Sequence, residues 1–364
     1  MGKHQLREWR KSTEFSCPQC SMPVHLKVGD IVIPHFAHQQ EASCSTMFSE
    51  GESQEHLEGK RQLYEFFLTK VDDVALEPYF KLLEQRPDLL ITTRSNQVPI
   101  EFQCSTIPLQ LIESRTKGYL SAGMKPIWIL HTPAQFSTLP QGVGVYNLSR
   151  FHESFFTYES PEGTVFLTYN PQTEKFHYFS SLIHIAGRQY VGIHRILPIS
   201  MQTFPFARPK APTAEELRLY VSVYLSSRMN FLKSSVLLNR RGINDPFLKN
   251  CYDLRILPIE LPLWIGLPVP KSNAFRQHNC EWQMRLVHYM MRNGLSFPDL
   301  SNGLIRKFLS WQDGLTEDHV NACMSYRDML LSMGIQSPDR TASFDEEKII
   351  PLFAERFLAK WKEN

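Results

Sequence analysis

The residue pattern of the chain changes at a proline-rich stretch, and this change constrains the fold more than any other feature. The prolines of that stretch are Pro205, Pro209 and Pro212. Short runs of alternating apolar residues precede it, and helical spacing follows it. Thr213 and Glu216 have the spacing of a capping box, so a helix is expected to begin there and run to about Leu238. The sequence therefore predicts an α/β part followed by an α-helical C-terminal domain over residues 207–364.

Further helices are expected in that C-terminal domain, each from the spacing of its apolar residues. Their predicted ranges are 274–292, 303–311, 317–333 and 346–362. The proline-rich stretch 256–270, which contains Trp264, is expected to be a loop that packs against these helices. The length of 364 residues is consistent with two or three domains.

Residues 51–150 have the element order of a compact α/β domain. Helical spacing predicts helices, and short alternating runs predict strands. The predicted order is a helix over 53–68, strands over 74–80, 88–93 and 98–104, a helix over 108–122, and strands over 127–131 and 143–148. This order favours a mixed sheet with helices packed against it. Residues 151–206 are predicted to form a β-rich connector with a hairpin near residue 170.

Cysteines and histidines are concentrated in residues 1–50. Cys17 and Cys20 are separated by two residues, and His35 and His38 follow about fifteen residues later. Thiolate and imidazole are the ligands that zinc prefers, and a tight turn lets both sulfurs face one ion. The spacing predicts a zinc-binding β-hairpin module with a structural ion. His35, His38 and Cys44 all remain candidates for the other ligands.

A second group of polar residues lies at the predicted strand ends. Glu101 and Gln103 share one face of their strand, because side chains alternate along an extended chain. A hairpin would bring Asp88 beside Glu101. Two carboxylates on adjacent strands can hold a divalent metal at a phosphate group, although such residues are more often solvated edge residues.

Taken in order, these motifs resemble those of the competence protein CoiA family. The segments that carry the resemblance are Cys17 to Cys20, His35 to His38, Gly51 to Lys60, Arg86 to Asp88, and Ile100 to Gln103. The middle segment is similar to the PD-(D/E)xK nuclease superfamily, whose core is helix, three strands, helix, strand. The resemblance implies a cytoplasmic protein of natural transformation that processes incoming single-stranded DNA or promotes its recombination. It implies DNA as partner, with recombination or DNA-uptake proteins as further partners.

The resemblance also implies roles for individual residues. Asp88 and Glu101 match the two acids that bind catalytic Mg²⁺ or Mn²⁺, and Gln103 stands where the superfamily usually has lysine. A neutral amide can do only part of the work of that lysine, and Lys60 on the first helix could substitute for it. The first helix also supplies His56 as a candidate site residue. Glu52 matches the acid that is often found at the start of this first helix in the superfamily.

Two sets of residues are candidates for DNA binding. Arg115 and Tyr119 are four residues apart on the second helix and resemble a helical pair that relatives aim at the active site. The second set lies in residues 207–310, which carry 15 Lys and Arg against 7 Asp and Glu, although the whole chain has a net charge of only +2. Basic side chains interleaved with aromatic ones suit single-stranded nucleic acid. The basic candidates in this block are Lys233, Arg240 and Arg241, with Arg228, Lys249 and Arg255 nearby.

Composition limits the remaining classes of function. No apolar run is long enough to cross a bilayer, and the odd count of seven cysteines fits a reducing compartment. The leading hypothesis is a metal-dependent nuclease. The alternatives are a DNA-binding recombination protein without turnover and, less directly, a protein-interaction adaptor built on the helical region.

Overall fold

The computed structural model describes residues 3–17, 20–29, 34–38, 53–94, 96–159 and 163–338. The chain divides into two compact units, each made of several separate segments. Unit 1 consists of Met1–Ser137, Thr168–Phe176 and Leu197–Ala207. Unit 2 consists of Thr138–Leu167, His177–Ile196 and Arg208–Asn364. Each unit is described separately below.

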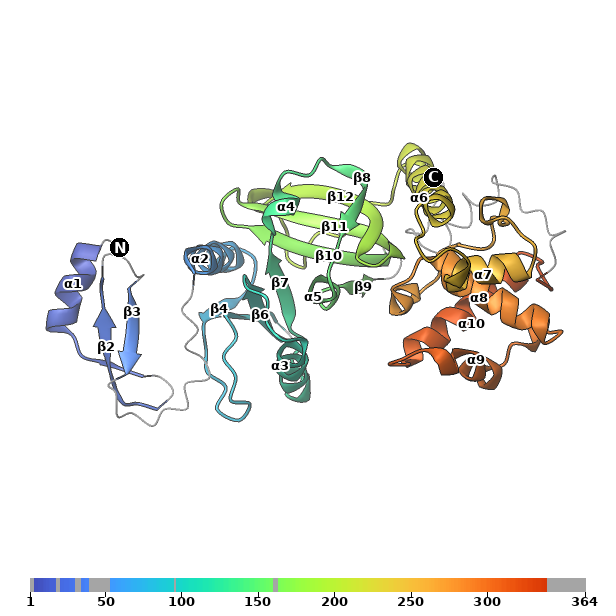
Figure 1. Ribbon diagram of the computed structural model, residues 1–364. Coiled ribbons are helices and arrows are strands. Elements are labelled where there is room, and N and C mark those ends of the chain that lie inside the picture. The colour runs from blue at the N-terminus through green and yellow to red at the C-terminus, as the bar shows by residue number, and fades with distance from the viewer. Residues whose placement is uncertain are drawn as a thin grey trace. The chain divides into compact units, whose positions relative to one another are not determined.

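The N-terminal part of unit 1 is a helix followed by a small antiparallel sheet (Figure 1). Its elements are α1 (Lys3–Ser12), β1 (Phe15–Ser16), β2 (Pro23–Lys27) and β3 (His35–His38). The central strand β2 pairs with β1 through Phe15 and Val24, and with β3 through Val24 and His38. The predicted hairpin is therefore confirmed, although its second strand is the histidine segment itself. The expected strand residues 31–33 lie outside the described residues.

The next part of unit 1, residues 53–137, has the predicted order of helix, three strands, helix, strand. Its elements are α2 (Gln54–Leu68), β4 (Asp73–Leu76), β5 (Leu89–Thr92), β6 (Gln97–Gln103), α3 (Leu109–Ser121), β7 (Ile127–His131) and the short α4 (Ala134–Ser137). Strands β4, β5 and β6 pair antiparallel, whereas β6 and β7 pair parallel. The sheet is therefore mixed, which confirms the predicted fold class of an α/β core with a small N-terminal β module.

Helices α2 and α3 cover opposite faces of this sheet (Figure 1). Phe102 of β6 packs so closely against α2 that a Cβ atom at Gly59 would lie 2.0 Å from its ring. The preceding residue, Glu101, is hydrogen bonded to Tyr119 of α3. Neighbouring residues of a strand point to opposite faces, so the two contacts place one helix on each side of β6.

Unit 2 begins with strands. Several of these strands have some residues in unit 2 and the others in unit 1. The first elements of unit 2 are β8 (Gly142–Asn147), α5 (Arg150–Glu153), β9 (Thr157–Glu159), β10 (Gly163–Asn170), β11 (Lys175–Ala186) and β12 (Gln189–Pro198). Strands β10 and β11 are neighbours in the sheet, as the predicted hairpin near residue 170 requires. Strand β12 was not predicted, and it pairs antiparallel with β8.

Five longer helices complete the described part of unit 2. They are α6 (Ala214–Leu237), α7 (Pro246–Asp253), α8 (Asn279–Arg292), α9 (Asn302–Phe308) and α10 (Glu317–Ser332). The predicted capping box of α6 is present, since Thr213 accepts from the main chain of Glu216 and Glu216 accepts from that of Thr213. The helix predicted from residue 274 is wrong at its start, because residues 272–275 form a separate short 3-10 helix and α8 begins at Asn279. The predicted helix over 346–362 lies outside the described residues.

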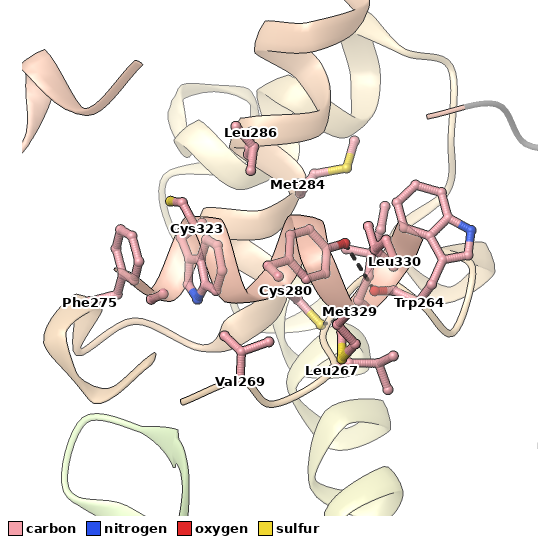
Figure 2. Packing of buried hydrophobic residues seen from close by; sticks show 14 of the residues in the cluster. Trp264, Leu267, Val269, Phe275, Cys280, Met284, Leu286, Cys323, Met329 and Leu330 are labelled. Atoms are coloured by element: carbon pink, nitrogen blue, oxygen red, sulfur yellow. Dashed lines mark hydrogen bonds between the residues drawn. The ribbon is translucent and has the colours of Figure 1, made fainter. Parts of the chain in front are cut away.

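The core of unit 2 forms between these helices and the stretch 256–270. Figure 2 shows Trp264, Leu267 and Val269 of that stretch among side chains of the surrounding helices. Trp264 is only 1% exposed, so the prediction of a packing loop is confirmed. Among the described residues, no helix is both long enough and apolar enough to cross a membrane.

Candidate functional site

The predicted acidic residues meet at one end of the sheet of unit 1. Strands β4 and β6 end there, and β5 begins there. The pairing of Leu89 with Ile100 places Asp88, one residue before β5, opposite Glu101 of β6. Asp88 Oδ2 accepts a hydrogen bond of 2.8 Å from the main-chain nitrogen of Phe102. The antiparallel pair of strands therefore brings the two carboxylates together as the sequence predicted.

Helix α2 contributes two basic side chains to this end of the sheet. His56 Nε2 lies 3.4 Å from Asp88 Oδ1, and Lys60 Nζ lies 3.8 Å from the same oxygen. The hydroxyl of Ser53 caps the helix by accepting from the main-chain nitrogen of His56. Since His56 and Lys60 are one helical turn apart, they approach Asp88 side by side. The structure thus places both predicted residues of α2 at the site.

Helix α3 contributes an arginine and a tyrosine, which both contact Glu101. Arg115 Nη2 lies 2.5 Å from Glu101 Oε1, and the Tyr119 hydroxyl donates to the same oxygen at 2.6 Å. Tyr119 is completely buried, and its hydroxyl holds Glu101, so the helical pair is directed at the site, while a contact of Tyr119 with DNA stays a prediction. The Arg115 side chain is 21% exposed and remains accessible from solvent.

The two carboxylates have opposite pKa shifts. Burial raises the pKa of Glu101 to about 8, with a further increase from Asp88, and Arg115 opposes the rise. Burial acts in the same direction on Asp88, but the hydrogen bond and charge of His56, with Lys60 and the Phe102 N–H, hold its pKa below the usual value. Without a bound cation the site therefore favours one ionised acid and one proton-retaining acid.

Sequence reasoning missed a third acid, Glu77, which follows the end of β4. Its Oε1 lies 2.5 Å from Lys60 Nζ, and its Oε2 lies 3.0 Å from Arg86 Nη2. The sequence offers little signal for this role, because Glu77 falls within a predicted strand and belongs to none of the motifs.

Two other residues, Gln103 and Glu52, were predicted at this site. The side-chain nitrogen of Gln103 donates to the main-chain oxygen of Ser105 at 2.8 Å, which turns its amide toward the loop after β6. Glu52 lies outside the described residues.

The N-terminal module contains a second group of ligand-type side chains. Atoms of Cys17, Cys20 and His38 lie within 4.8 Å of one another, and Cys20 Sγ is 3.3 Å from His38 Nε2. A turn closed by the bond from Ser21 N to Cys17 O holds the two cysteines together. Their donor chemistry fits zinc. His35 is exposed at the other end of β3 and does not belong to this group. Cys44 lies outside the described residues.

The basic residues of unit 2 separate into exposed and buried ones. Lys233, Arg240 and Arg241 are exposed, as a nucleic-acid contact would require. Arg228 is not available for such a surface, because it is 2% exposed and donates hydrogen bonds inside the core. Helical spacing could have indicated this burial, since Arg228 lies four residues after Tyr224 on the apolar face of α6.

Comparisons with known proteins identify a family that the chain matches. The family model described as "Competence protein CoiA, nuclease-like domain" matches residues 52–208, and "Competence protein CoiA, N-terminal domain" matches residues 1–47. The chain is 31% identical over 286 residues to the "Competence protein CoiA" of Bacillus subtilis (strain 168). That alignment covers 77% of this chain and 73% of the relative. No solved structure matches the chain.

Proposed function

Since the chain belongs to the competence protein CoiA family, we propose that it is a divalent-metal-dependent nuclease that acts on incoming single-stranded DNA or promotes its recombination. The observation that carries the proposal is the meeting of Asp88, Glu101 and Lys60 at one end of a mixed sheet. Carboxylates on adjacent strands beside a buried ammonium are suited to phosphodiester hydrolysis.

The donor set of this site fits Mg²⁺ or Mn²⁺, because both cations prefer carboxylate oxygens. Asp88 and Glu101 would hold the ion. The hydrogen bonds to Glu101 from the described residues go to Oε1, which leaves Oε2 for a ligand. When bound, such an ion polarises a phosphate oxygen and lowers the pKa of a bound water.

The side chains around the acids would bind and orient the phosphate. Lys60 supplies a positive charge next to Asp88, where Gln103 supplies none, so we assign to Lys60 the stabilisation of charge that develops on the phosphate. Arg115 is partly exposed and would contact a neighbouring phosphate. The exposed Lys233, Arg240 and Arg241 of unit 2 are candidates for further contacts with the DNA backbone.

Cleavage assays test this proposal. Purified protein should cut single- or double-stranded DNA with Mg²⁺ or Mn²⁺ and not in EDTA, and Asp88→Ala or Glu101→Ala should abolish cutting. Asp73→Ala is a matched control, because Asp73 is an exposed acid at the other end of β4. If the wild-type protein cuts no DNA with either metal, the nuclease proposal fails.

One observation favours the alternative of a DNA-binding recombination protein without turnover. Arg115 and Tyr119 already occupy Glu101 Oε1, and Gln103 lacks the usual lysine charge. Under this alternative the protein retards single-stranded DNA in a gel without cutting it in any metal. Transformation frequency in a competent host would then be unaffected by Asp88→Ala.

We also propose that the N-terminal module binds a structural zinc ion through Cys17, Cys20 and His38, with Cys44 as the candidate for the fourth ligand. Metal analysis should find about one equivalent of zinc, which the double substitution Cys17→Ser and Cys20→Ser removes. Cys104→Ser, outside the module, should keep the zinc. Zinc retained by the double variant would contradict the assignment.

A further inference from the structure

Glu77 contacts two cationic side chains, Lys60 and Arg86, and Lys60 also lies 3.8 Å from Asp88. The Glu77 carboxylate bridges Lys60 and Arg86, with one oxygen for each. We propose that Glu77 is a positioning residue that keeps Lys60 beyond hydrogen-bond distance of Asp88 and so leaves the Asp88 carboxylate available for a divalent metal. This inference rests on the proposed function, because it treats Asp88 as a metal ligand.

The backbone fixes Glu77 in this position. Its main-chain nitrogen donates to the main-chain oxygen of Asp88 at 3.0 Å, so the two residues lie side by side where β4 ends and β5 begins. Glu77 has a φ of +50°, a left-handed conformation that costs energy for a residue with a Cβ atom. Glycine would adopt this conformation without that cost. A glutamate here is therefore explained by its carboxylate rather than by its backbone.

Because Lys60 is buried, its ammonium group needs a carboxylate partner. Lys60 is 4% exposed, and a buried ammonium is costly unless a carboxylate pairs with it. Among the described residues, Lys60 makes ion pairs with two carboxylates, Glu77 at 2.5 Å and Asp88 at 3.8 Å. Of these two, Glu77 makes the closer contact. If the charge of Glu77 were removed, Lys60 would pair with Asp88 and compete with a metal for the same oxygen.

The alternative role for Glu77, that of a third metal ligand, is not supported by the geometry. Both of its oxygens already contact cations. Among the described residues, Glu77, Asp88 and Glu101 do not form a group close enough to share one ion. Glu77 therefore acts through Lys60 and Arg86 rather than on the metal.

The test is the substitution Glu77→Gln, which removes the charge and keeps the shape. A crystal structure of this variant in EDTA should show Lys60 Nζ moved from 3.8 Å to hydrogen-bond distance of Asp88 Oδ1. Titration with Mn²⁺ should show affinity reduced about 10- to 100-fold, the range typical of residues that orient metal ligands. The structure in EDTA contains no metal, so it tests the inference whether or not the protein is a nuclease.

The matched control is Glu84→Gln. Glu84 lies in the same loop, is exposed, and has a nearly identical φ of +51°. The Glu84→Gln substitution should leave both the Lys60 position and the Mn²⁺ affinity unchanged.

A second variant separates positioning from simple stabilisation. Adding Lys60→Met to Glu77→Gln should restore Mn²⁺ affinity, because the cation that competes for Asp88 is gone. A merely structural role would make the double variant worse than either single one. The inference fails if Lys60 keeps its distance from Asp88 in Glu77→Gln, or if that variant binds Mn²⁺ as the wild type does. By contrast, wild-type protein that binds no Mn²⁺ overturns the proposed function.

Discussion

A partly exposed arginine and a buried one show how differently the two units use the same side chain. In unit 1, Arg115 pairs with the carboxylate of Glu101 at the proposed active site. In unit 2, Arg228 donates to the main-chain oxygens of Leu261, Pro262 and Ile265, and the structure pairs it with no carboxylate in the described residues. Arg115 donates to the main-chain oxygen of Arg86 and also to a carboxylate that could bind a ligand, whereas the partners named for Arg228 all belong to the backbone.

The different partners of Arg115 and Arg228 indicate that the charge of Arg115 serves the proposed site and the charge of Arg228 serves the fold. A buried ion pair contributes little net stability, because desolvation offsets the attraction. Hydrogen bonds from a charged donor to three carbonyls fix a loop that has no regular structure of its own. Arg228 should therefore matter for folding, and the Glu101 cluster should matter more for chemistry and pH response.

The largest effect is expected at Arg228. Arg228→Met keeps the aliphatic stem but leaves three carbonyls without their donor, which should lower the free energy of unfolding by roughly 3 kcal/mol or more. Urea unfolding followed by the fluorescence of the buried Trp264 and Trp282 measures this change. A loss below about 1 kcal/mol would contradict the structural role.

The next effect is a pH dependence at Glu101. Its pKa is raised to about 8 from the usual 4.5, so the folded state retains a proton that the unfolded chain loses. Stability should therefore fall as pH rises between these values, by at most about 1.4 kcal/mol per pH unit. Unfolding measured from pH 5 to 8 in EDTA tests this slope. Glu101→Gln should abolish it and the exposed Glu113→Gln should not.

A smaller effect is expected at Tyr119. Tyr119→Phe removes the hydroxyl that donates to Glu101 and should cost about 1 kcal/mol. Because that hydrogen bond favours the ionised acid, its loss should also raise the pKa of Glu101 further. Chemical unfolding and carboxyl-carbon NMR measure the two changes. Tyr252→Phe, at a residue that is 71% exposed, should change neither.

The smallest effect extends the comparison to an exposed arginine. Arg61 is 52% exposed and pairs with Glu58 and Glu65 along α2. Arg61→Ala should cost no more than about 0.5 kcal/mol, and the cost should shrink in high salt. Unfolding at low and high salt measures it. A loss as large as that of Arg228→Met would mean that burial is not what distinguishes these arginines.

Much of unit 1 was predictable because its periodicity is local. Strand Ile127–His131 was predicted with its observed bounds, and the helix over 53–68 begins one residue later than expected. The pairing of Asp88 with Glu101 followed from the predicted strands, since an antiparallel hairpin places their ends together.

Other features depend on contacts that a linear pattern does not contain. The start of α8 was misplaced because Lys271 and Arg276 adopt left-handed φ values, which interrupt a run of helix-forming residues. The role of Glu77 depends on Lys60, which lies on a different element, so only the folded chain relates the two. Counting charges did not show that Arg228 is buried, although its helical spacing from Tyr224 is a signal in the sequence for that burial.

The division of the chain into interleaved segments limits how the protein can be dissected. Unit 2 takes its strands from residues 138–167 and 177–196 but its longer helices from residues beyond 208. The hydroxyl of Tyr220 on α6 donates to the main-chain oxygen of Ser181, and Ile183 and Val191 pack in the same core. A fragment that stops at residue 207 would retain these strands without the helices that cover them. The nuclease-like region therefore cannot be expected to fold as a separate fragment, because helices that follow residue 208 pack on strands that precede it.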